Sequence, residues 1–385
     1  MSKQKKIILI GPAYPYRGGN ALFITQTYDV LKDHFEAKIY NYKLLYPSLL
    51  FPGTTQFDES EKQVFNVPSE RLINSISPFN WYVVAKKIIE EKADLVVFDW
   101  WHPFFGLCHG VISTFIKKAY KNKILFITEN VISHEANKID TILTKLGLKN
   151  ASMFLTLSKS VEEELKRFAK VRKIYRSELP RYDYYQTDNI VNISSFKGEL
   201  GITEEDKVLL FFGYIRKYKG LDILIKAFPK ILEKYPKTFL LVVGEFYDNP
   251  SSYLKLIDDL NIGHKIKVIN KFIPNEEISK YYQVSDVVIL PYLSATQSAI
   301  LNVTYSFKKP VIATDVGGLS EFVEKGKTGI IVKPNSVDEI VRGYSEYLRL
   351  KPSVDFARNI EQHTSKNSFE NLPELFEQII LESGN

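Results

Sequence analysis

Short apolar runs that alternate with longer amphipathic stretches constrain the fold of this chain more than any other feature. An apolar run of this kind is typical of a parallel strand that is buried on both faces. The stretches between the runs, such as 19–35, have the length of helices. Strands that alternate with helices predict βαβ units and parallel sheets. The expected strands are 6–11, 37–42, 94–99, 123–128, 152–158, 207–213, 238–245, 265–272, 286–292, 310–314 and 329–334.

A length of 385 residues is too great for one ordinary core and predicts two α/β domains of comparable size. The boundary is expected in the polar stretch 181–195. We therefore predict a first domain over 1–187, a second over 188–360 and a helical tail over 361–385. The segment 43–68 has no clear period and is interpreted as an irregular loop or a short hairpin.

Composition excludes several classes of function. The net charge of +6 arises from 51 basic and 45 acidic residues without a dense basic stripe, so no nucleic-acid partner is expected. The single cysteine, Cys108, excludes a disulfide framework and fits a cytoplasmic location. The apolar run near the N-terminus is too short for a signal peptide, and no run approaches the roughly 20 residues of a membrane helix. Attraction to the inner face of an anionic membrane is compatible with the charge.

The segment 290–321 is the most informative part of the sequence. It reads as the end of a strand, a loop of small polar residues, a helix, the strand 310–314 and a turn that contains Gly317 and Gly318. The helix directs its free N–H groups and partial positive charge toward the polar loop. Two successive strand-to-loop junctions of this kind predict an anion site, for which a nucleotide diphosphate is the usual occupant.

This segment resembles the donor-sugar site of the nucleotide-sugar glycosyltransferases with the GT-B fold, specifically glycosyltransferase family 4. The match is closest in PVIATDVGGLSEFVEKGKTGIIVKP (310–334), and a second family element is LLFFGYIRKYKGLDILIKAF (209–228). The resemblance implies an α/β protein with two Rossmann-like, doubly wound parallel-sheet domains that face each other across a cleft. It also implies a helical tail that crosses back to the first domain, and metal-independent transfer with retention from a nucleotide-diphosphate sugar. No cofactor is expected beyond that co-substrate.

The resemblance assigns donor binding to several residues of the second domain. Lys219 keeps a family lysine, whereas Tyr214 replaces an arginine, so Arg216 is the expected substitute cation for the diphosphate. The family's Glu-x7-Glu pair would align with Ala295 and Val303 and is missing. The remaining donor-site candidates are Thr296, Gln297 and Ser298 of the polar loop and Glu321 after the Gly-Gly turn, for which capping a helix over 321–326 is the alternative.

In the first domain, Gly18 and Gly19 resemble the family's glycine-rich loop, where small residues let diphosphate and acceptor approach the backbone. Polar groups follow two further strands, at the edge where ligands bind to parallel sheets. These groups are Asp99, His102, Glu129, Asn130, His134 and Glu135, and His102, Glu129 and His134 are the catalytic candidates. The nearby aromatic residues Trp100, Trp101, Phe104 and Phe105 are interpreted as core, with stacking on a sugar or contact with a lipid carrier as the alternative.

These observations predict a glycosyltransferase that uses a glycan or lipid-linked acceptor, with peripheral membrane association, in surface polysaccharide or glycolipid assembly. Two alternatives stay open at this point. One is a sugar-nucleotide epimerase on the same fold, and the other is a non-catalytic protein that binds nucleotide sugars or glycans, which the missing glutamates favour.

Overall fold

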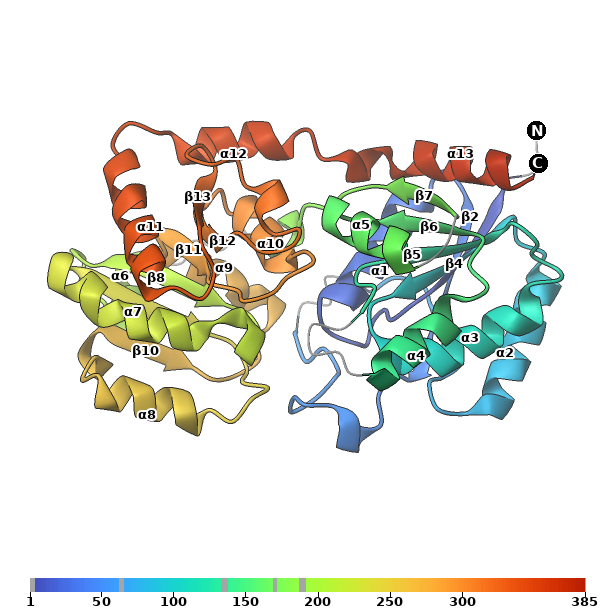
Figure 1. Cartoon of the computed structure of the whole chain (residues 1–385), viewed down its shortest axis with the longest axis horizontal. Coiled ribbons are helices and arrows are strands. Elements are labelled where there is room, and N and C mark those ends of the chain that lie inside the picture. The colour runs from blue at the N-terminus through green and yellow to red at the C-terminus, as the bar shows by residue number, and fades with distance from the viewer. Residues whose placement is uncertain (1–3, 62–65, 133–137, 169–171, 187–191, 385) are drawn as a thin grey trace. The chain divides into compact units, whose positions relative to one another are not determined.

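The structure is a computed structural model that describes residues 4–61, 66–132, 138–168, 172–186 and 192–384 (Figure 1). The chain forms two compact units. The first comprises Met1–Asp58, Phe65–Pro180 and Ser368–Asn385, and the second comprises Glu59–Val64 and Arg181–Asn367. Apart from the short segment Glu59–Val64, the chain passes from the first unit to the second at Arg181 and returns to the first unit at Ser368.

The first unit is built on a seven-stranded parallel sheet with the order β3-β2-β1-β4-β5-β6-β7. Its strands are β1 (Lys6–Ile10), β2 (Glu36–Leu44), β3 (Glu70–Asn74), β4 (Leu95–Trp100), β5 (Ile124–Thr128), β6 (Met153–Thr156) and β7 (Lys173–Arg176). Its longer helices are α1 (Gly19–Leu31), α2 (Pro78–Glu91), α3 (Gly106–Ile116), α4 (Lys138–Leu148), α5 (Lys159–Phe168) and α13 (Leu372–Ser383), and its short 3-10 helices are η1 (Ser48–Leu50), η2 (Pro103–Phe105) and η7 (Ser368–Asn371).

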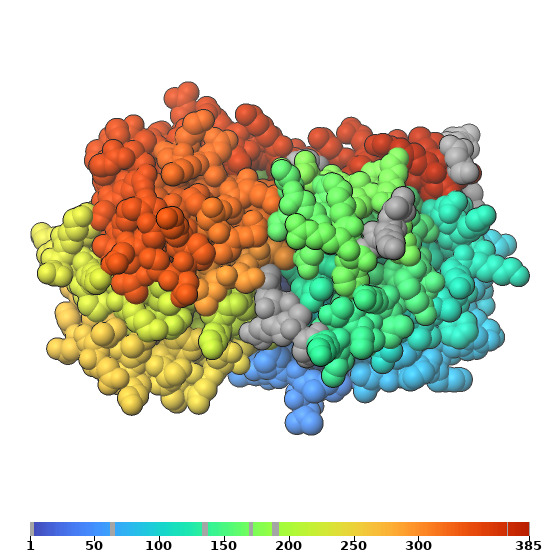
Figure 2. Space-filling model, in the orientation of Figure 1, coloured from blue at the N-terminus to red at the C-terminus, as the bar shows by residue number. Residues whose placement is uncertain are grey.

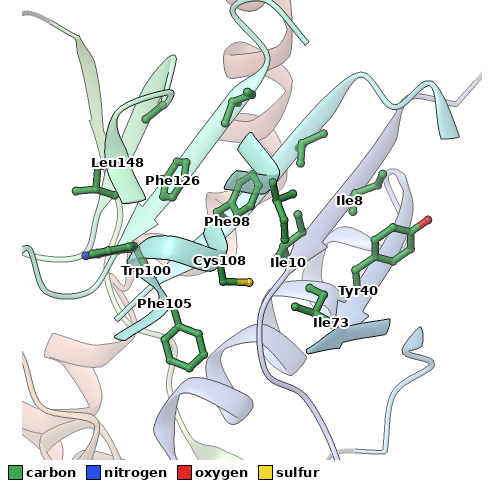
Figure 3. Packing of buried hydrophobic residues seen from close by; sticks show 14 of the residues in the cluster. Ile8, Ile10, Tyr40, Ile73, Phe98, Trp100, Phe105, Cys108, Phe126 and Leu148 are labelled. Atoms are coloured by element: carbon green, nitrogen blue, oxygen red, sulfur yellow. The ribbon is translucent and has the colours of Figure 1, made fainter. Parts of the chain in front are cut away.

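Both faces of this sheet are buried because successive side chains of a strand point to opposite sides. In β1, Ile8 and Ile10 pack with residues of α2 and α3, whereas Ile7 and Leu9 pack with residues of α1 and α13. Figure 3 shows the first of these two layers, in which Phe98, Trp100 and Phe126 stand over Phe105 and Cys108. Continuous apolar strands were the sequence signal for this arrangement.

The second unit is built on a six-stranded parallel sheet with the order β10-β9-β8-β11-β12-β13. Its strands are β8 (Lys207–Phe212), β9 (Thr238–Val243), β10 (Ile266–Ile269), β11 (Val287–Leu290), β12 (Val311–Thr314) and β13 (Gly329–Val332). Its longer helices are α6 (Ile193–Glu199), α7 (Leu221–Lys234), α8 (Ser251–Asp259), α9 (Asn275–Val284), α10 (Ala299–Ser306), α11 (Val337–Leu350) and α12 (Phe356–Thr364), and its 3-10 helices are η3 (Asp183–Tyr185), η4 (Lys217–Lys219), η5 (Gly263–Lys265) and η6 (Ser320–Phe322).

One face of the second sheet packs with apolar residues of α7, α8 and α11. Figure 2 shows these three helices on the visible surface of this unit, where they shield the sheet from solvent. On the opposite face, Phe212 of β8 packs its ring against Tyr281 and Tyr282 of α9. Each unit is thus a three-layer α/β structure.

The sequence predicted a strand at each of the positions where β1, β2, β4 to β6 and β8 to β13 lie, and the structure confirms them. It missed β3 and β7 because these edge strands are partly exposed and polar, so neither forms an apolar run. In the segment 43–68, β2 extends to Leu44, and Tyr16 forms an isolated antiparallel bridge with Phe57. The helix considered over 321–326 is wrong, since only the short helix η6 forms there.

Trp100 and Phe105 are fully buried, as their interpretation as core residues predicted, whereas Phe104 is half-buried against that core. No helix formed by the described residues combines the length and the apolar character needed to cross a membrane.

Candidate functional site

Each sheet has one place where its strand order reverses, and ligands of open α/β sheets bind outside the carboxyl ends of the strands at such a place. In the first unit the reversal lies between β1 and β4, and in the second unit between β8 and β11. The predicted donor loop follows β11, and the glycine-rich loop follows β1. The topology thus places both predicted loops where a ligand would bind to their sheets.

Glycines allow close backbone packing at the second unit's reversal point. Gly220 has a φ of 68°, and a Cβ on it would lie 2.0 Å from the carbonyl oxygen of Pro291. Gly244, after β9, has a φ of 145°, and a Cβ there would lie 2.1 Å from the carbonyl oxygen of Gly213. The first contact places the end of η4 against the loop that follows β11, and the second places the turn after β9 against the turn after β8.

Lys219 lies at the centre of this arrangement. Its Nζ is 3.4 Å from the position that a Cβ on Gly213 would occupy, and Ile300, in the first turn of α10, borders the same point. The side chain is buried, and its ammonium lies over the ring of Tyr292 at 5.5 Å from the ring centroid. Among the described residues it makes no hydrogen bond and no ion pair. Burial and the neighbouring Arg216 charge lower the pKa of Lys219 to about 8.

Arg216 is held by aromatic side chains. Its guanidinium lies over the Tyr247 ring at 5.2 Å, and Tyr247 is packed against Tyr214 with ring centroids 4.6 Å apart. Tyr214, the residue that replaces the family arginine, therefore supports the ring on which Arg216 rests. The structure places Arg216 and Lys219 close enough for their charges to interact, and their binding of a diphosphate remains a prediction from the resemblance.

The polar loop after β11 leads directly into α10. Thr314 fixes its start, because the Thr314 hydroxyl donates to the carbonyl oxygens of Tyr292 (2.6 Å) and Leu290 (3.3 Å). Ser298 is the residue that precedes α10, and its side chain makes no capping hydrogen bond. Thr296 is buried, and Gln297 has a buried Oε1 without a hydrogen-bond partner among the described residues. The loop therefore presents polar groups beside the N-terminus of a helix.

Glu321 follows the Gly-Gly turn as a residue of the short helix η6. It lies exposed in η6, where its backbone N–H donates to the carbonyl of Gly318 at 3.3 Å. Its assignment to the donor site remains a prediction from the resemblance.

The glycine-rich loop of the first unit is anchored by Asn41, a fully buried residue of β2. The Asn41 amide donates to the carbonyl oxygens of Ala13 (3.0 Å) and Tyr14 (2.9 Å), and its oxygen accepts from the Ala13 N–H (3.1 Å). Gly18 ends the loop with a φ of 102°, which favours glycine, and Gly19 opens α1. The first turn of α1 thus begins at the reversal point of this sheet.

Two carboxyl groups lie next to each other at the same edge. Asp99, near the end of β4, is fully buried, and neither of its oxygens has a conventional hydrogen-bond donor among the described residues. Burial and the adjacent Glu129 carboxylate raise the pKa of Asp99 well above its usual range. Glu129 follows β5 and accepts a hydrogen bond from Asn20 Nδ2 at 2.9 Å. Next to the glycine-rich loop, the pair therefore keeps a proton to a higher pH than an isolated aspartate would.

The other polar candidates of the first unit have different surroundings. His102 is half-buried, and its Nδ1 accepts a hydrogen bond from the backbone of Phe104 at 3.2 Å, which caps η2. Asn130 donates to the carbonyl of Trp101 at 3.4 Å. His134 and Glu135 lie outside the described residues. The catalytic roles of His102, Glu129 and His134 remain predictions.

Sequence reasoning missed three residues that shape these sites: Asn20, Asn41 and Tyr292. Asn20 directly follows Gly19, so its place at the start of a helix was a usable signal. Asn41, inside an otherwise apolar strand, was a second signal, because a buried amide requires partners. Tyr292 gave none, since its contact with Lys219 arises only in the folded unit.

No group of three or more His, Cys, Asp or Glu side chains that could hold a metal ion occurs in the part of the chain that the structure describes. Metal-independent chemistry and the absence of a cofactor remain predictions of the resemblance.

Comparison with known proteins agrees with this arrangement. The family model described as "Glycosyl transferases group 1" matches residues 192–366. An uncharacterized glycosyltransferase of Methanocaldococcus jannaschii is 30% identical over 278 residues, which cover 67% of this chain and 67% of that protein. The chain spans less than half the length of further relatives, the corynebacterial D-inositol 3-phosphate glycosyltransferases.

Solved structures extend the likeness to the whole fold. Sucrose-phosphate synthase from Thermosynechococcus elongatus matches with a TM-score of 0.75 at 15% identity, covering 98% of this chain and 100% of that chain. Anabaena HepE, solved in complex with UDP-glucose, matches with a TM-score of 0.73 at 17% identity over 98% of each chain.

The chain belongs to the group 1 glycosyl transferases, and its two parallel-sheet Rossmann-like units match the GT-B fold. The family and the fold class that the sequence indicated are thereby confirmed.

Proposed function

We propose that this glycosyltransferase moves a sugar, with retention of configuration, from a nucleotide-diphosphate sugar to a glycan or lipid-linked acceptor. The observation that supports this most directly is Lys219, a buried ammonium with no acidic partner among the described residues and a second cation beside it. A buried charge is costly unless it is compensated. A diphosphate bound at the β8–β11 reversal point would supply the missing negative charge.

The proposed chemistry needs charge stabilisation more than a protein nucleophile. The bond between the anomeric carbon and the diphosphate oxygen breaks, the acceptor oxygen bonds to that carbon, and the leaving phosphate takes the acceptor proton. Lys219 and Arg216 would stabilise the negative charge that develops on the diphosphate. Thr296, Gln297 and Ser298 would bind phosphate or sugar hydroxyls beside the N-terminus of α10. Glu321 is proposed to contact the donor from η6.

The first unit is proposed to bind the acceptor. Glu129 is held by Asn20 next to Gly19 and would orient an acceptor hydroxyl, with His102 and His134 as further candidates. Gly18 and Gly19 would leave room for the diphosphate to approach the start of α1. No cofactor or metal is proposed. Cytoplasmic work at a membrane face, in surface polysaccharide or glycolipid assembly, rests on family analogy.

The test is thermal stabilisation of the purified protein by UDP, GDP, ADP, CMP and dTDP and by their sugar conjugates. Stabilisation by one of them at concentrations well above its Kd identifies the donor base. The fold is similar to that of Anabaena HepE, which was solved in complex with UDP-glucose, so UDP is the first nucleotide to try. If no nucleotide shifts Tm, the donor site is degenerate and the proposal is wrong.

Lys219→Ala should abolish the nucleotide-induced shift and lower kcat by about 10²-fold or more, the usual loss of one transition-state donor. Lys217→Ala is the matched control, because Lys217 is an exposed lysine of the same short helix η4. The pH dependence has a defined sign: the ammonium is present below the Lys219 pKa of about 8, so nucleotide affinity should weaken as pH rises above that value. Wild-type kinetics in Lys219→Ala would remove the proposed role.

The alternatives have distinct outcomes in the same assays. An epimerase would convert the nucleotide sugar without any acceptor and release no transferred product. A non-catalytic binding protein would be stabilised by nucleotide yet show neither transfer nor slow donor hydrolysis. The missing Glu-x7-Glu pair is the feature that favours the binding protein.

A further inference from the structure

The outer surface of the helix layer α2–α3–α4 exposes large apolar side chains. Phe79 is 79% exposed, Ile139 65%, Ile142 57% and Phe115 47%. Scattered apolar residues are normal on a protein surface, but a contiguous patch is not. The residues that make up this patch, called the apolar patch below, are Phe79, Tyr82, Val83, Leu107, Phe115, Ile139, Ile142 and Leu146.

Contacts between the helices bring members of the apolar patch together. The rings of Tyr82 on α2 and Phe115 on α3 meet edge to face, with centroids 5.2 Å apart. On the other side of α3, Gly110 approaches α4 so closely that a Cβ on it would lie 2.5 Å from the carbonyl oxygen of Leu146. Figure 1 shows α2, α3 and α4 as neighbours beside the seven-stranded sheet.

The patch is not required by the core of the first unit. In α2, Trp81, Val84 and Ile88 pack into the core, while Phe79 and Tyr82 point outward. The helix α3 likewise buries Cys108 and Ile112 and contains no charged residue at all, although it lies in the outermost layer. A helix that is apolar on both faces is normally buried. A partner surface is therefore expected to cover the exposed face of α3.

Lysines border the patch. Lys117, Lys118 and Lys121 directly follow α3, are exposed, and make no ion pair with any residue that the structure describes. Lys145 and Lys149 are exposed at the end of α4, and the Lys86 ammonium lies over the Tyr82 ring at 4.9 Å. An apolar surface bordered by long basic side chains complements a bilayer with anionic headgroups.

We propose that the apolar patch is a membrane-docking surface that inserts its aromatic and aliphatic side chains among the headgroups of an anionic bilayer. A second copy of this chain fits the surface less well, because a two-fold contact through the patch would bring the lysines of one copy against those of the other. The surface belongs to the first unit alone, and the proposal requires neither nucleotide binding nor transfer activity.

The test is co-sedimentation of the full chain with vesicles of phosphatidylcholine alone or of phosphatidylcholine with one quarter phosphatidylglycerol. We expect binding to the anionic vesicles, weakened when NaCl is raised from about 0.1 to about 0.5 M. The double variant F79S/F115S should lower the partition coefficient by about tenfold or more. K117E/K118E should lower it for anionic vesicles. The matched control L254S/K255E changes an exposed leucine and an exposed lysine of α8, in the second unit, and should bind as the wild type does.

A second measurement does not depend on the folding of these variants. The single native cysteine, Cys108, is buried, so a cysteine introduced at Phe79 can be labelled selectively with an environment-sensitive fluorophore. Its emission should shift to the blue on addition of anionic vesicles, whereas the same label at Leu254 should not respond. The proposal is overturned if the wild type binds neither vesicle, if F79S/F115S binds as the wild type does, or if the labels respond alike. It is also overturned if light scattering shows a dimer that F79S/F115S dissociates.

Discussion

Buried ionisable groups without an opposite charge distinguish both reversal points of this protein. Lys219 in the second unit and Asp99 in the first are buried, and among the described residues neither has an ion-pair partner. Groups of this kind destabilise a fold unless a ligand or a proton compensates them. They are therefore better explained by binding and chemistry than by stability.

At the residue scale, Asp99→Asn should make the fold less sensitive to pH. Because the pKa of Asp99 is raised, the folded protein keeps a proton at pH values where the unfolded chain has released it. Wild-type stability should accordingly fall as pH rises above the ordinary aspartate pKa of about 4. An asparagine resembles the protonated acid and does not titrate. The variant should therefore lose less stability between pH 5 and pH 8 than the wild type does.

Urea denaturation at pH 5 and pH 8 measures this difference. Glu129→Gln tests the same pair from its other member, because its amide oxygen can still accept the hydrogen bond from Asn20 while the carboxylate next to Asp99 is gone. That variant should also flatten the pH dependence, since the two carboxyls titrate as a pair. An identical pH dependence in wild type and Asp99→Asn would contradict the shared proton.

At the scale of elements, glycines set the distance between η4 and the loop after β11. A Cβ at Gly220 would lie 2.0 Å from the carbonyl oxygen of Pro291, and the φ of 68° at Gly220 adds backbone strain for any other residue. Gly220→Ala should therefore lower the free energy of unfolding by roughly 1–3 kcal/mol and weaken nucleotide binding, because Lys219 precedes the shifted residue. Thermal denaturation with and without nucleotide measures both effects.

Gly198→Ala is the control for that substitution. Gly198 lies in α6, has no heavy atom within 4 Å of a built Cβ, and does not have a positive φ. Alanine should leave stability unchanged or raise it by a few tenths of a kcal/mol, up to about 1 kcal/mol. Equal behaviour of the two variants would show that the contact between Gly220 and Pro291 does not position the site.

Some helices and strands could be predicted from the sequence alone, and others could not. The buried strands were predictable because each is an apolar run, whereas Lys219 was singled out through the family resemblance. The edge strands β3 and β7 were not, because their pairing depends on the neighbouring strands β2 and β6 rather than on their own apolar content. Asp99 was visible as a polar residue at a strand end, but its fully buried contact with Glu129 was not.

At the scale of the whole molecule, the C-terminal helix belongs to the first unit although it follows the second in sequence. Phe376 of α13 is fully buried with Leu372 and Ile379 against residues of β1, β4 and α1. Phe376→Ala should therefore lower the free energy of unfolding by roughly 3–5 kcal/mol. Hydrogen exchange should show the loss of protection in β1 and β4, with little change in β8 and β11.

Leu381→Ala tests whether this effect is specific to the buried face of α13. Leu381 is 64% exposed on the same helix, so its truncation should change the free energy of unfolding by less than about 0.5 kcal/mol. Equal losses in the two variants, or a loss of protection confined to the second unit, would contradict the assignment of this helix to the first unit.

The sequence by itself determined the α/β class, the two sheets and the family, because apolar period and strand-to-loop motifs are local properties of the chain. Tertiary structure decided the rest. It brought Asn20 to Glu129, Tyr292 beneath Lys219, and α13 back to β1 and β4. It also left the patch of α2, α3 and α4 on the surface, although α3 by its composition resembles a buried helix. The physical reason is that charge compensation and burial depend on contacts between residues far apart in the chain. A local sequence pattern does not predict such contacts.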